Sequence, residues 1–364
     1  MQVTIVGLPG SGKTSVFNAL TGAHAETGGF SGGRAAPNIG VVKVPDARLD
    51  RLTELFHPRK TVPADVTYVD VALPAGATRE GTVSAEVLAL VRNADALVHV
   101  VRAFSDAGGT DAPDPWHDVA ELDTEFAIAD LTIIEKRLEK LRTSGRHGSP
   151  AEREANAQEE ALLARIEPEL SGGRPLRAVT LTDDEELRLR GYRFLSQKPV
   201  LVLLNVDESR LGSAAELEAA GIERYGTVQA DVAALSAKIE AELAQLSADD
   251  AALFMQELGI EEPSRGRVIR LTYALLGLFS FFTAGEDECR AWTLRRGATA
   301  VDAAAAVHSD LARGFIRAEV VTFDDLMASG SMAEARKRGL LRSEGKTYAV
   351  RDGDVIEVLF NVAR

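Results

Sequence analysis

“GLPGSGKTS”, residues 7–15, follows directly on the apolar run “QVTIV”. It completes the pattern G-x-x-x-x-G-K-[ST], with an apolar strand before it and the helical text “VFNAL” after it. The glycines let backbone N–H groups converge on phosphate oxygens, Lys13 adds a positive charge, and the hydroxyl of Thr14 can bind Mg²⁺. The sequence therefore predicts a phosphate site made by Pro9, Gly10, Ser11, Gly12, Lys13, Thr14 and Ser15.

Three more apolar runs predict the rest of a parallel sheet: “VTYVDVAL” (66–73), “ALVHVV” (96–101) and “PVLVLLN” (199–205). Continuous apolar strands separated by helical patterns are typical of a sheet covered on both faces, so we expect a doubly wound α/β domain. Asp70 ends the apolar strand expected within the first of these runs, where P-loop proteins place a carboxylate near the metal. A carboxylate with only a turn role is the alternative.

Two loops are candidates for the nucleotide base. “NVDE” (205–208) closes an apolar strand at the sheet edge where a base can lie, and “SAK” (236–238) begins a helix about 30 residues later. Asn205 can brace the base or the phosphate loop, and Glu208 or a nearby backbone group can read the base edge. GTP-specific switches carry Asp at the fourth position and usually Lys at the second, so this variant predicts weakened guanine preference. The predicted contacts are Asn205, Val206, Glu208, Ser236 and Ala237.

An amphipathic insertion interrupts the sheet. In the text “ELDTEFAIADLTIIEKRLEKLR” (121–142), apolar residues recur at 4-3-4-3 spacing, which predicts a long helix with a narrow seam. Ser149, Pro150 and Glu152 then form a capping-box signature that begins a second helix. We expect a projecting helical hairpin; an ordinary bundle packed on the sheet is the alternative.

The C-terminal part predicts a separate module. Residues 273–282, “YALLGLFSFF”, are too short to span a bilayer and are interpreted as a buried helix or domain joint. From residue 283, short strands, one helix and turn signals such as “RDGD” predict a compact α+β unit of the β-grasp type. Three domains are thus expected. They are a nucleotide-binding domain (1–120 with 199–280), an inserted helical hairpin (121–198) and a β-grasp domain (283–364).

Composition limits the class of protein. The 364 residues carry a formal charge of −14, which argues against nucleic-acid binding by the whole surface, and we expect no DNA specificity. Cys289 is the only cysteine, which excludes an intramolecular disulfide and fits a reducing compartment. No secretory signal and no membrane-spanning run is found, so we expect a cytoplasmic, monomeric protein with no membrane partner.

Motifs along the whole chain resemble the Obg-like ATPase family, in its YchF-type branch. The text that carries the resemblance is “GLPGSGKTSVFNAL”, “PNIGVVKVPDARLD”, “HVVRAF”, “NVDE”, “SAKIEAEL”, “FMQELGIEEP”, “RVIRLTYALLGL”, “FFTAGEDECRAWTLRRGATA”, “GFIRAEVVTFDDL” and “YAVRDGDVIEVLFNV”. The resemblance implies a nucleotide domain with an inserted hairpin and a C-terminal TGS module. It also implies ATP binding with some tolerance of GTP, slow hydrolysis with Mg²⁺, and association with ribosomes.

Three departures from the family bear on hydrolysis. Relatives usually read “GLPNVGKS”, where the Asn is associated with bound potassium; Gly10 stands there in this chain, so potassium activation is not expected. Arg34 replaces the first-switch Thr and could clamp phosphate as a catalytic partner of Lys13, or belong to a degenerate loop. In “DVALP” (70–74) a switch Gly is missing and Pro74, which has no N–H, enters the turn. Sensing of the γ-phosphate is the function most affected.

Three function classes remain open from the sequence. The first is an ATP-dependent, possibly GTP-tolerant, switch that contacts ribosomal RNA or protein. The second is a hydrolysis-deficient protein that uses nucleotide as a structural ligand. The third, a small-molecule kinase, does not explain “NVDE” or a TGS-like tail.

Histidines and tail cations complete the candidates. His99 alternates with apolar residues and is interpreted as structural, whereas His308 could face a partner or solvent. A basic set in the tail could meet ribosomal RNA phosphates or be a solvated face: Arg313, Arg317, Arg336, Lys337, Arg338 and Arg342.

Overall fold

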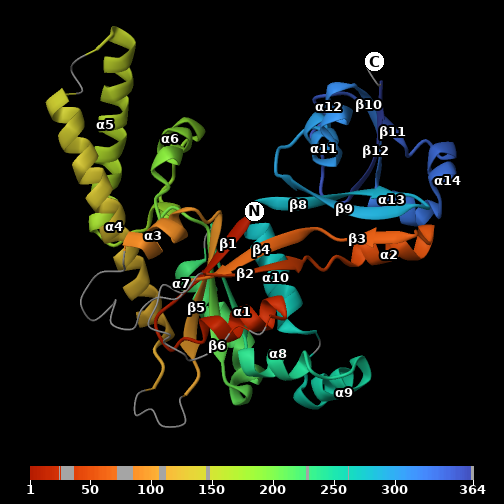
Figure 1. The fold of residues 1–364 in the computed structure, drawn as a ribbon, viewed down its shortest axis with the longest axis horizontal. Helices are drawn as coiled ribbons and strands as arrows, with labels where there is room; N and C mark the ends of the chain where they lie inside the picture. Colours follow the sequence, from red (N-terminus) through yellow and green to blue (C-terminus); the bar gives the residue numbers. More distant parts are fainter. Residues whose placement is uncertain are drawn as a thin grey trace. The chain divides into compact units, whose positions relative to one another are not determined.

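The computed structural model describes residues 1–23, 25, 37–71, 85–105, 112–144, 148–226, 229–260 and 262–361. It divides into two compact units. The first comprises Met1–Gly40 and Thr67–Val268, and the second comprises Val41–Val66 and Ile269–Arg364. Figure 1 shows the fold. Within the described residues, no helix combines the length and apolar character needed to cross a bilayer.

The first unit is built on a six-stranded sheet, in which every pairing with a printed register is parallel. Its order is β2 (Asn38–Lys43), β4 (Asp65–Asp70), β1 (Gln2–Val6), β5 (Ala96–Ala103), β6 (Val200–Val206) and β7 (Ala230–Leu235). All seven residues of β6 are buried, as expected for a strand covered on both faces. The predicted parallel sheet is confirmed.

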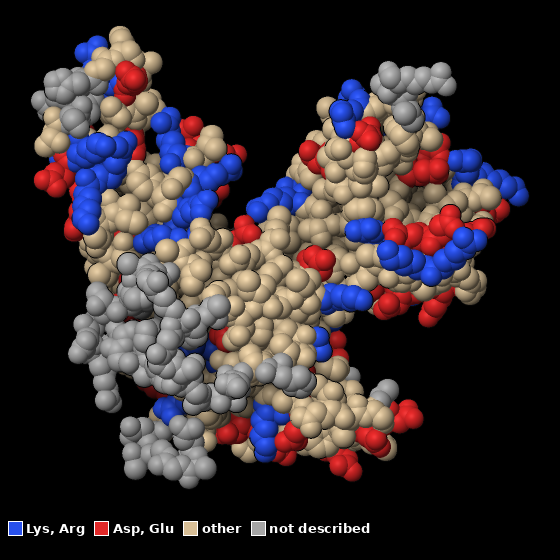
Figure 2. Space-filling view, in the orientation of Figure 1, with Lys and Arg blue, Asp and Glu red and all other residues tan. Residues whose placement is uncertain are grey.

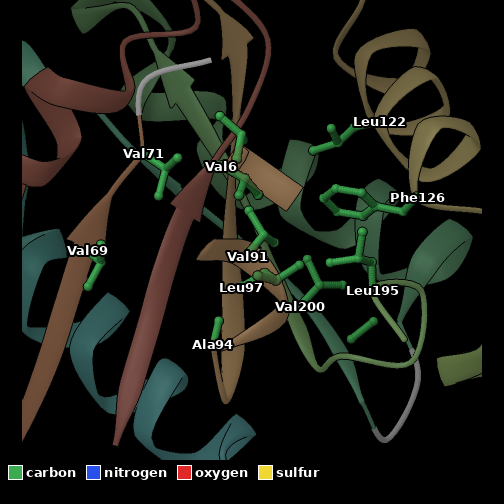
Figure 3. Packing of buried hydrophobic residues seen from close by; sticks show 12 residues of the cluster. Val6, Val69, Val71, Val91, Ala94, Leu97, Leu122, Phe126, Leu195 and Val200 are labelled. Atoms are coloured by element: carbon green, nitrogen blue, oxygen red, sulfur yellow. The ribbon is translucent and has the colours of Figure 1, made fainter. Parts of the chain in front are cut away.

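Helices cover this sheet and create its core. α1 (Lys13–Thr21) and α8 (Ala237–Leu243) contact each other, and α3 (Ala85–Arg92), α4 (Pro115–Ser144) and α7 (Ala214–Tyr225) contribute to clusters on the sheet. In Figure 3, Leu122 and Phe126 of α4 lie beside Val6, Leu97 and Val200 of the strands. α9 (Ala248–Leu258) and α10 (Ser264–Leu275) follow.

The helical hairpin is present. α5 (Pro150–Ser171) runs back along the distal part of α4, and both helices share a buried cluster that includes Ile134, Leu138, Leu163 and Ile166. The predicted cap is also confirmed, because the Ser149 side chain accepts from the Glu152 N–H while Glu152 accepts from the Ser149 N–H. α4 begins six residues before the predicted start at 121, and its proximal turns pack on the sheet. The distal part of α4 therefore forms the predicted hairpin with α5, whereas its proximal part packs on the sheet as the alternative prediction had it.

Shorter elements return the chain from the hairpin to β6. These are a 3-10 turn at Leu176–Ala178, α6 (Asp183–Leu189) and a second 3-10 turn at Arg190–Tyr192. Buried Asp130 of α4 accepts from the N–H groups of Leu195 and Ser196 at 3.0 and 2.8 Å. This carboxylate fastens the base of the hairpin to the segment that enters β6.

The second unit contains another six-stranded sheet, ordered β11, β10, β12, β8, β9, β3. The bounds are β8 (Leu278–Ala284), β9 (Glu288–Arg295), β10 (Phe315–Thr322), β11 (Arg342–Glu344), β12 (Asp354–Phe360) and β3 (Lys60–Val62). β12 runs parallel to β8, whereas the β8–β9 and β10–β12 pairs are antiparallel. α11 (Ala300–Val307) packs on one face, which completes the β-grasp arrangement. α12 (Ser309–Arg313), α13 (Phe323–Ser329) and α14 (Met332–Lys337) connect the strands.

The run at 273–282 differs from its interpretation as a buried helix or joint. Only its first part is helical, because α10 ends at Leu275 and β8 begins at Leu278. Gly277 makes the turn between them with φ +67°. The β-grasp unit therefore begins five residues before the predicted 283. A short, fully apolar run does not distinguish a buried helix from a buried strand.

The segment between β2 and β4 differs from its predicted place in the nucleotide-binding domain. α2 (Ala47–Phe56) and β3 lie in the second unit, where β3 pairs in parallel with β9 and α2 contacts β8 and β9. Arg48 fastens α2 there through Asp352 at 2.9 Å, and it also pairs at 2.8 Å with Asp46, the N-cap of α2. This part of the second unit precedes the rest of it by some 200 residues in sequence, and no local pattern announces such a long-range strand pairing.

Candidate nucleotide-binding site

The phosphate loop joins β1 to α1 in a conformation that requires glycine. Gly10 and Gly12 have φ values of +81° and +86°, and Gly12 is the N-cap of α1. At Gly7, a Cβ would lie 2.2 Å from the carbonyl oxygen of Val100. Pro9 and Gly10 form the exposed turn of the loop, whereas Ser11 is buried and its hydroxyl lacks a hydrogen-bond partner in the described part of the chain.

Lys13 supplies a cation close to this loop. Its Nζ donates to the carbonyl oxygen of Leu8 at 2.9 Å, and the residue is only 9% exposed. Burial lowers the pKa of Lys13 to about 8, although the nearby carboxylate of Asp70 opposes this shift. The ammonium is thus folded over the loop, where an anion would offset its loss of hydration.

Thr14 and Asp70 come together from separate elements. The Thr14 hydroxyl donates to Asp70 Oδ2 at 3.0 Å, and the side-chain amide of Asn38 donates to the same oxygen at 3.3 Å. The other carboxylate oxygen of Asp70 is buried and has no hydrogen-bond partner among the described residues. A hard cation such as Mg²⁺, which prefers oxygen ligands, would satisfy this oxygen. The described residues contain no cluster of three His, Cys, Asp or Glu side chains that could hold a metal alone. The pair therefore fits a shared protein–phosphate site.

A cleft of about 990 Å³ extends from the phosphate loop to the two predicted base loops. Its lining is drawn from α1, β6, α8 and α9 and the loops after the strands: Gly12, Ser15, Asn18, Phe104, Asn205, Val206, Asp207, Glu208, Ser209, Ser236, Ala237, Lys238, Ala241 and Leu258. A cleft of this size falls within the range that small-molecule ligands occupy.

Asn205 holds the two sides of the cleft together. Its Nδ2 donates to the carbonyl oxygen of Ser11 at 3.1 Å, and its Oδ1 accepts from the N–H of Ala237 at 3.1 Å. One buried amide thereby links the phosphate loop, β6 and the start of α8. The Ser236 hydroxyl lies beside this link, buried and without a described hydrogen-bond partner. The structure favours the bracing role of Asn205, one of the two that the sequence predicts.

The outer rim of the cleft carries charged groups. The Lys238 Nζ and the Glu208 Oε2 lie 3.7 Å apart, and the Asp207 carboxylate accepts from the Ser105 N–H at 3.1 Å. Sequence reasoning did not select Phe104, Lys238, Ala241 or Leu258 as site residues. Phe104 directly follows β5, so its place at the carboxyl edge of the sheet was a usable signal. Leu258 at the end of α9 gave no comparable signal.

Two predicted switch residues lie outside the described part of the chain. Arg34 and Pro74 both belong to undescribed ranges, 26–36 and 72–84. The expectations about a charge clamp and about γ-phosphate sensing therefore stay predictions.

The two histidines considered above occupy different environments. His99 lies in β5, is 2% exposed, and has a pKa lowered to about 4 by burial. His308 is exposed, and its Nδ1 accepts from the Asp310 N–H at the start of α12. His308 thus acts as a helix cap.

The predicted basic set of the tail is largely neutralised within the second unit. Arg338 and Lys337 pair with Glu334 at 3.1 and 3.8 Å, and Arg336 and Arg317 pair with Glu319. Two further pairs join Arg313 to Asp310 and Arg342 to Asp354. Figure 2 shows basic and acidic side chains interspersed on the visible face of the protein. An anionic partner would have to compete with these pairs.

Comparisons with known proteins cover the full chain. Residues 2–137 match a family model described as a 50S ribosome-binding GTPase. Residues 278–361 match the model for the C-terminal region of YchF GTPases, which is described as a protein of unknown function. The chain is 39% identical to the ribosome-binding ATPase YchF of Bacillus subtilis and 41% identical to that of Haemophilus ducreyi, with 98% of both chains covered in each comparison. The structure resembles that of the Schizosaccharomyces pombe YchF GTPase with a TM-score of 0.85 and 27% identity, covering 99% of this chain and 97% of that one.

Proposed function

The chain belongs to the YchF family of P-loop proteins, and on this basis we propose that it is a nucleotide-dependent switch that hydrolyses ATP slowly and associates with the ribosome. One observation carries the proposal. The buried Asn205 amide joins the phosphate loop to the two loops proposed for the base, and residues of all three loops line one cleft. GTP is a second possible nucleotide.

We assign the phosphate-binding role to the loop from Pro9 to Ser15. Its backbone N–H groups and the start of α1 would hold phosphate oxygens, and the Lys13 ammonium would turn from the Leu8 carbonyl toward them. Thr14 and Asp70 would hold Mg²⁺, which neutralises charge on phosphate oxygens when it is bound. Val206, Glu208, Ser236 and Ala237 would surround the base.

Slow turnover follows from the groups that this site offers. Phosphoryl transfer depends mainly on positioning and electrostatic stabilisation, which Lys13 can supply and which Arg34 would add if it contacts phosphate. The two carboxylates at the base end, Asp207 and Glu208, are engaged by the Ser105 N–H and by Lys238. Gly10 has no side-chain oxygen, so no potassium requirement is proposed.

The test of the nucleotide function is multiple-turnover hydrolysis of ATP and GTP with Mg²⁺. We expect slow turnover that is lost in Lys13→Ala and kept in Lys60→Ala, an exposed lysine of the second unit. Tight nucleotide binding without Lys13-dependent turnover would instead identify a hydrolysis-deficient protein that uses nucleotide as a structural ligand. That second candidate is favoured by the “GRAAPN” and “DVALP” departures.

The ribosomal partner rests on the relatives, which are named ribosome-binding ATPases. A ribosomal partner would place this protein in the cytoplasm. Co-sedimentation with ribosomes should depend on whether ATP or ADP is present. Equal recovery with ATP, with ADP and without nucleotide would contradict the switch function, and no recovery would contradict the ribosomal partner.

A further inference from the structure

The rim of the base end carries an ion pair that joins the two base loops. Glu208 begins the 3-10 turn Glu208–Ser213 directly after β6, and Lys238 lies in the first turn of α8. The Nζ and Oε2 atoms are 3.7 Å apart, and both residues line the cleft. Lys238 also lies 4.0 Å from Glu242, one helical turn further on.

The backbone beneath both side chains is fixed. Ala237, the neighbour of Lys238, donates its N–H to Asn205, and the carbonyl oxygen of Asp207, the neighbour of Glu208, accepts from the Arg210 N–H at 3.0 Å. The pair is exposed, with the Lys238 side chain 71% accessible, so each side chain can still turn toward a ligand. The hydrogen-bonded backbone and the exposed charged groups of Glu208 and Lys238 would thus place two opposite charges at the edge of a bound base.

The two purines make opposite demands on such a pair. Guanine presents adjacent N–H donors on its Watson–Crick edge, which a carboxylate can accept, whereas adenine presents a ring-nitrogen acceptor beside one amino donor. An ionised carboxylate only accepts hydrogen bonds, and an ammonium only donates them. A carboxylate held by an ammonium is therefore less available to guanine, while the ammonium remains suited to a ring-nitrogen acceptor.

We propose that Lys238 is a specificity-determining residue that disfavours guanine nucleotides by engaging Glu208. The inference rests on the proposed function, since it requires a purine nucleotide in this cleft. Lys238, the third residue of “SAK”, would thus affect base preference through Glu208 of the “NVDE” loop. Because an exposed pair interacts weakly, the effect on the ratio of guanine to adenine affinity is expected to be about two- to fivefold.

The experiment is calorimetric titration of the full chain with ADP and with GDP, each with Mg²⁺. Lys238→Met keeps the apolar stem and removes the charge, so we expect GDP affinity relative to ADP to rise by about two- to fivefold. Lys238→Arg should keep the wild-type ratio. Lys60→Met is the matched control, because Lys60 forms a comparable exposed pair with Glu288 at 3.6 Å in the second unit.

A double variant separates specificity from a general change in the loop. If Lys238 acts through the carboxylate, the gain in relative GDP affinity should disappear in Glu208→Gln combined with Lys238→Met. An unchanged GDP-to-ADP ratio in Lys238→Met, or a gain that persists in the double variant, would overturn the inference while leaving nucleotide binding intact. Absence of binding of either nucleotide to the wild-type protein would overturn the proposed function as well.

Discussion

The side-chain amide of Asn205, at the end of β6, donates to the carbonyl oxygen of Ser11 at 3.1 Å across 194 positions of sequence. The same side chain accepts from the Ala237 N–H, so a single buried residue fixes the phosphate loop relative to both base loops.

Asn205→Ala should weaken nucleotide binding although the Asn205 side chain is not expected to contact phosphate. The substitution leaves a carbonyl and an N–H without their buried partner, at a cost of about 1–3 kcal/mol each that falls mainly on folding. Of this we expect about 1.4–2.7 kcal/mol to appear in binding, which lowers ADP affinity about 10- to 100-fold. Calorimetric titration measures the effect. Asn93→Ala removes a surface amide that accepts from Arg193 and should bind ADP as the wild type does. Wild-type affinity in Asn205→Ala would show that the loops hold their positions without this link.

Gly12→Ala should impair binding more than Gly10→Ala. Both glycines have left-handed φ values, +86° and +81°, so both substitutions carry the backbone cost of that region, about 1–2 kcal/mol. Among the described residues, the added Cβ would meet a neighbour only at Gly12, 2.4 Å from Nδ2 of Asn205, whereas none lies within 4 Å of it at Gly10. We expect an affinity for ADP at least about tenfold lower in Gly12→Ala than in Gly10→Ala. Equal losses in both variants would mean that backbone strain alone accounts for the effect.

The sequence predicts the features that depend on local chemistry. The phosphate loop needs glycines at fixed spacing, and the second hairpin helix needs Ser149 and Glu152 three residues apart, so both could be recognised from neighbouring residues. The pairing of β3 with β9 could not be recognised in this way, because Thr61 and Cys289 are far apart in sequence and meet only through tertiary packing. Leu258 likewise reaches the cleft through the position of a whole helix. The start of β8 was missed because Phe279, Phe281 and Phe282 satisfy a buried helix and a buried strand equally well.

His99 should make the first unit less stable in mild acid. Its pKa is lowered from about 6.5 in the unfolded chain to about 4, mainly by burial, while Asp123 opposes the shift and Arg177 and Lys13 reinforce it. Above pH 6.5 the imidazole is neutral in both states and has no effect. Between pH 6.5 and 4 the unfolded chain binds the proton more readily, so the unfolding free energy falls by about 1.4 kcal/mol per pH unit and about 3 kcal/mol in total.

Urea unfolding at pH 7 and pH 5 tests this dependence. Trp116 reports on the first unit when Trp292, the second of the two tryptophans, is replaced by Phe. Between these pH values we expect the wild type to lose about 2 kcal/mol more than His99→Gln. His308→Gln, which changes an exposed histidine of the other unit, should behave as the wild type does. The same pH dependence in His99→Gln and the wild type would assign the acid sensitivity to other groups.

Arg48 should be a main stabilising contact of the second unit. Its guanidinium pairs with Asp46 at 2.8 Å and Asp352 at 2.9 Å and lies 5.2 Å from the centre of the Phe282 ring. Arg48→Ala removes these contacts and leaves two carboxylates without their cation, so we expect the unfolding free energy of this unit to fall by about 2–3 kcal/mol. The probe is Trp292 fluorescence during urea unfolding, in a Trp116→Phe background.

The control for Arg48 is an arginine of the same segment whose contacts are exposed. Arg59 pairs with Asp287 at 3.4 Å, but both side chains are more than four-fifths accessible. Exposed pairs contribute about 0–1 kcal/mol, so Arg59→Ala should change the unfolding free energy little. Since residues 41–66 enter the second unit through α2 and β3, a loss in Arg48→Ala no larger than that in Arg59→Ala would mean that strand pairing with β9, and not the Arg48 contacts, holds this segment in place.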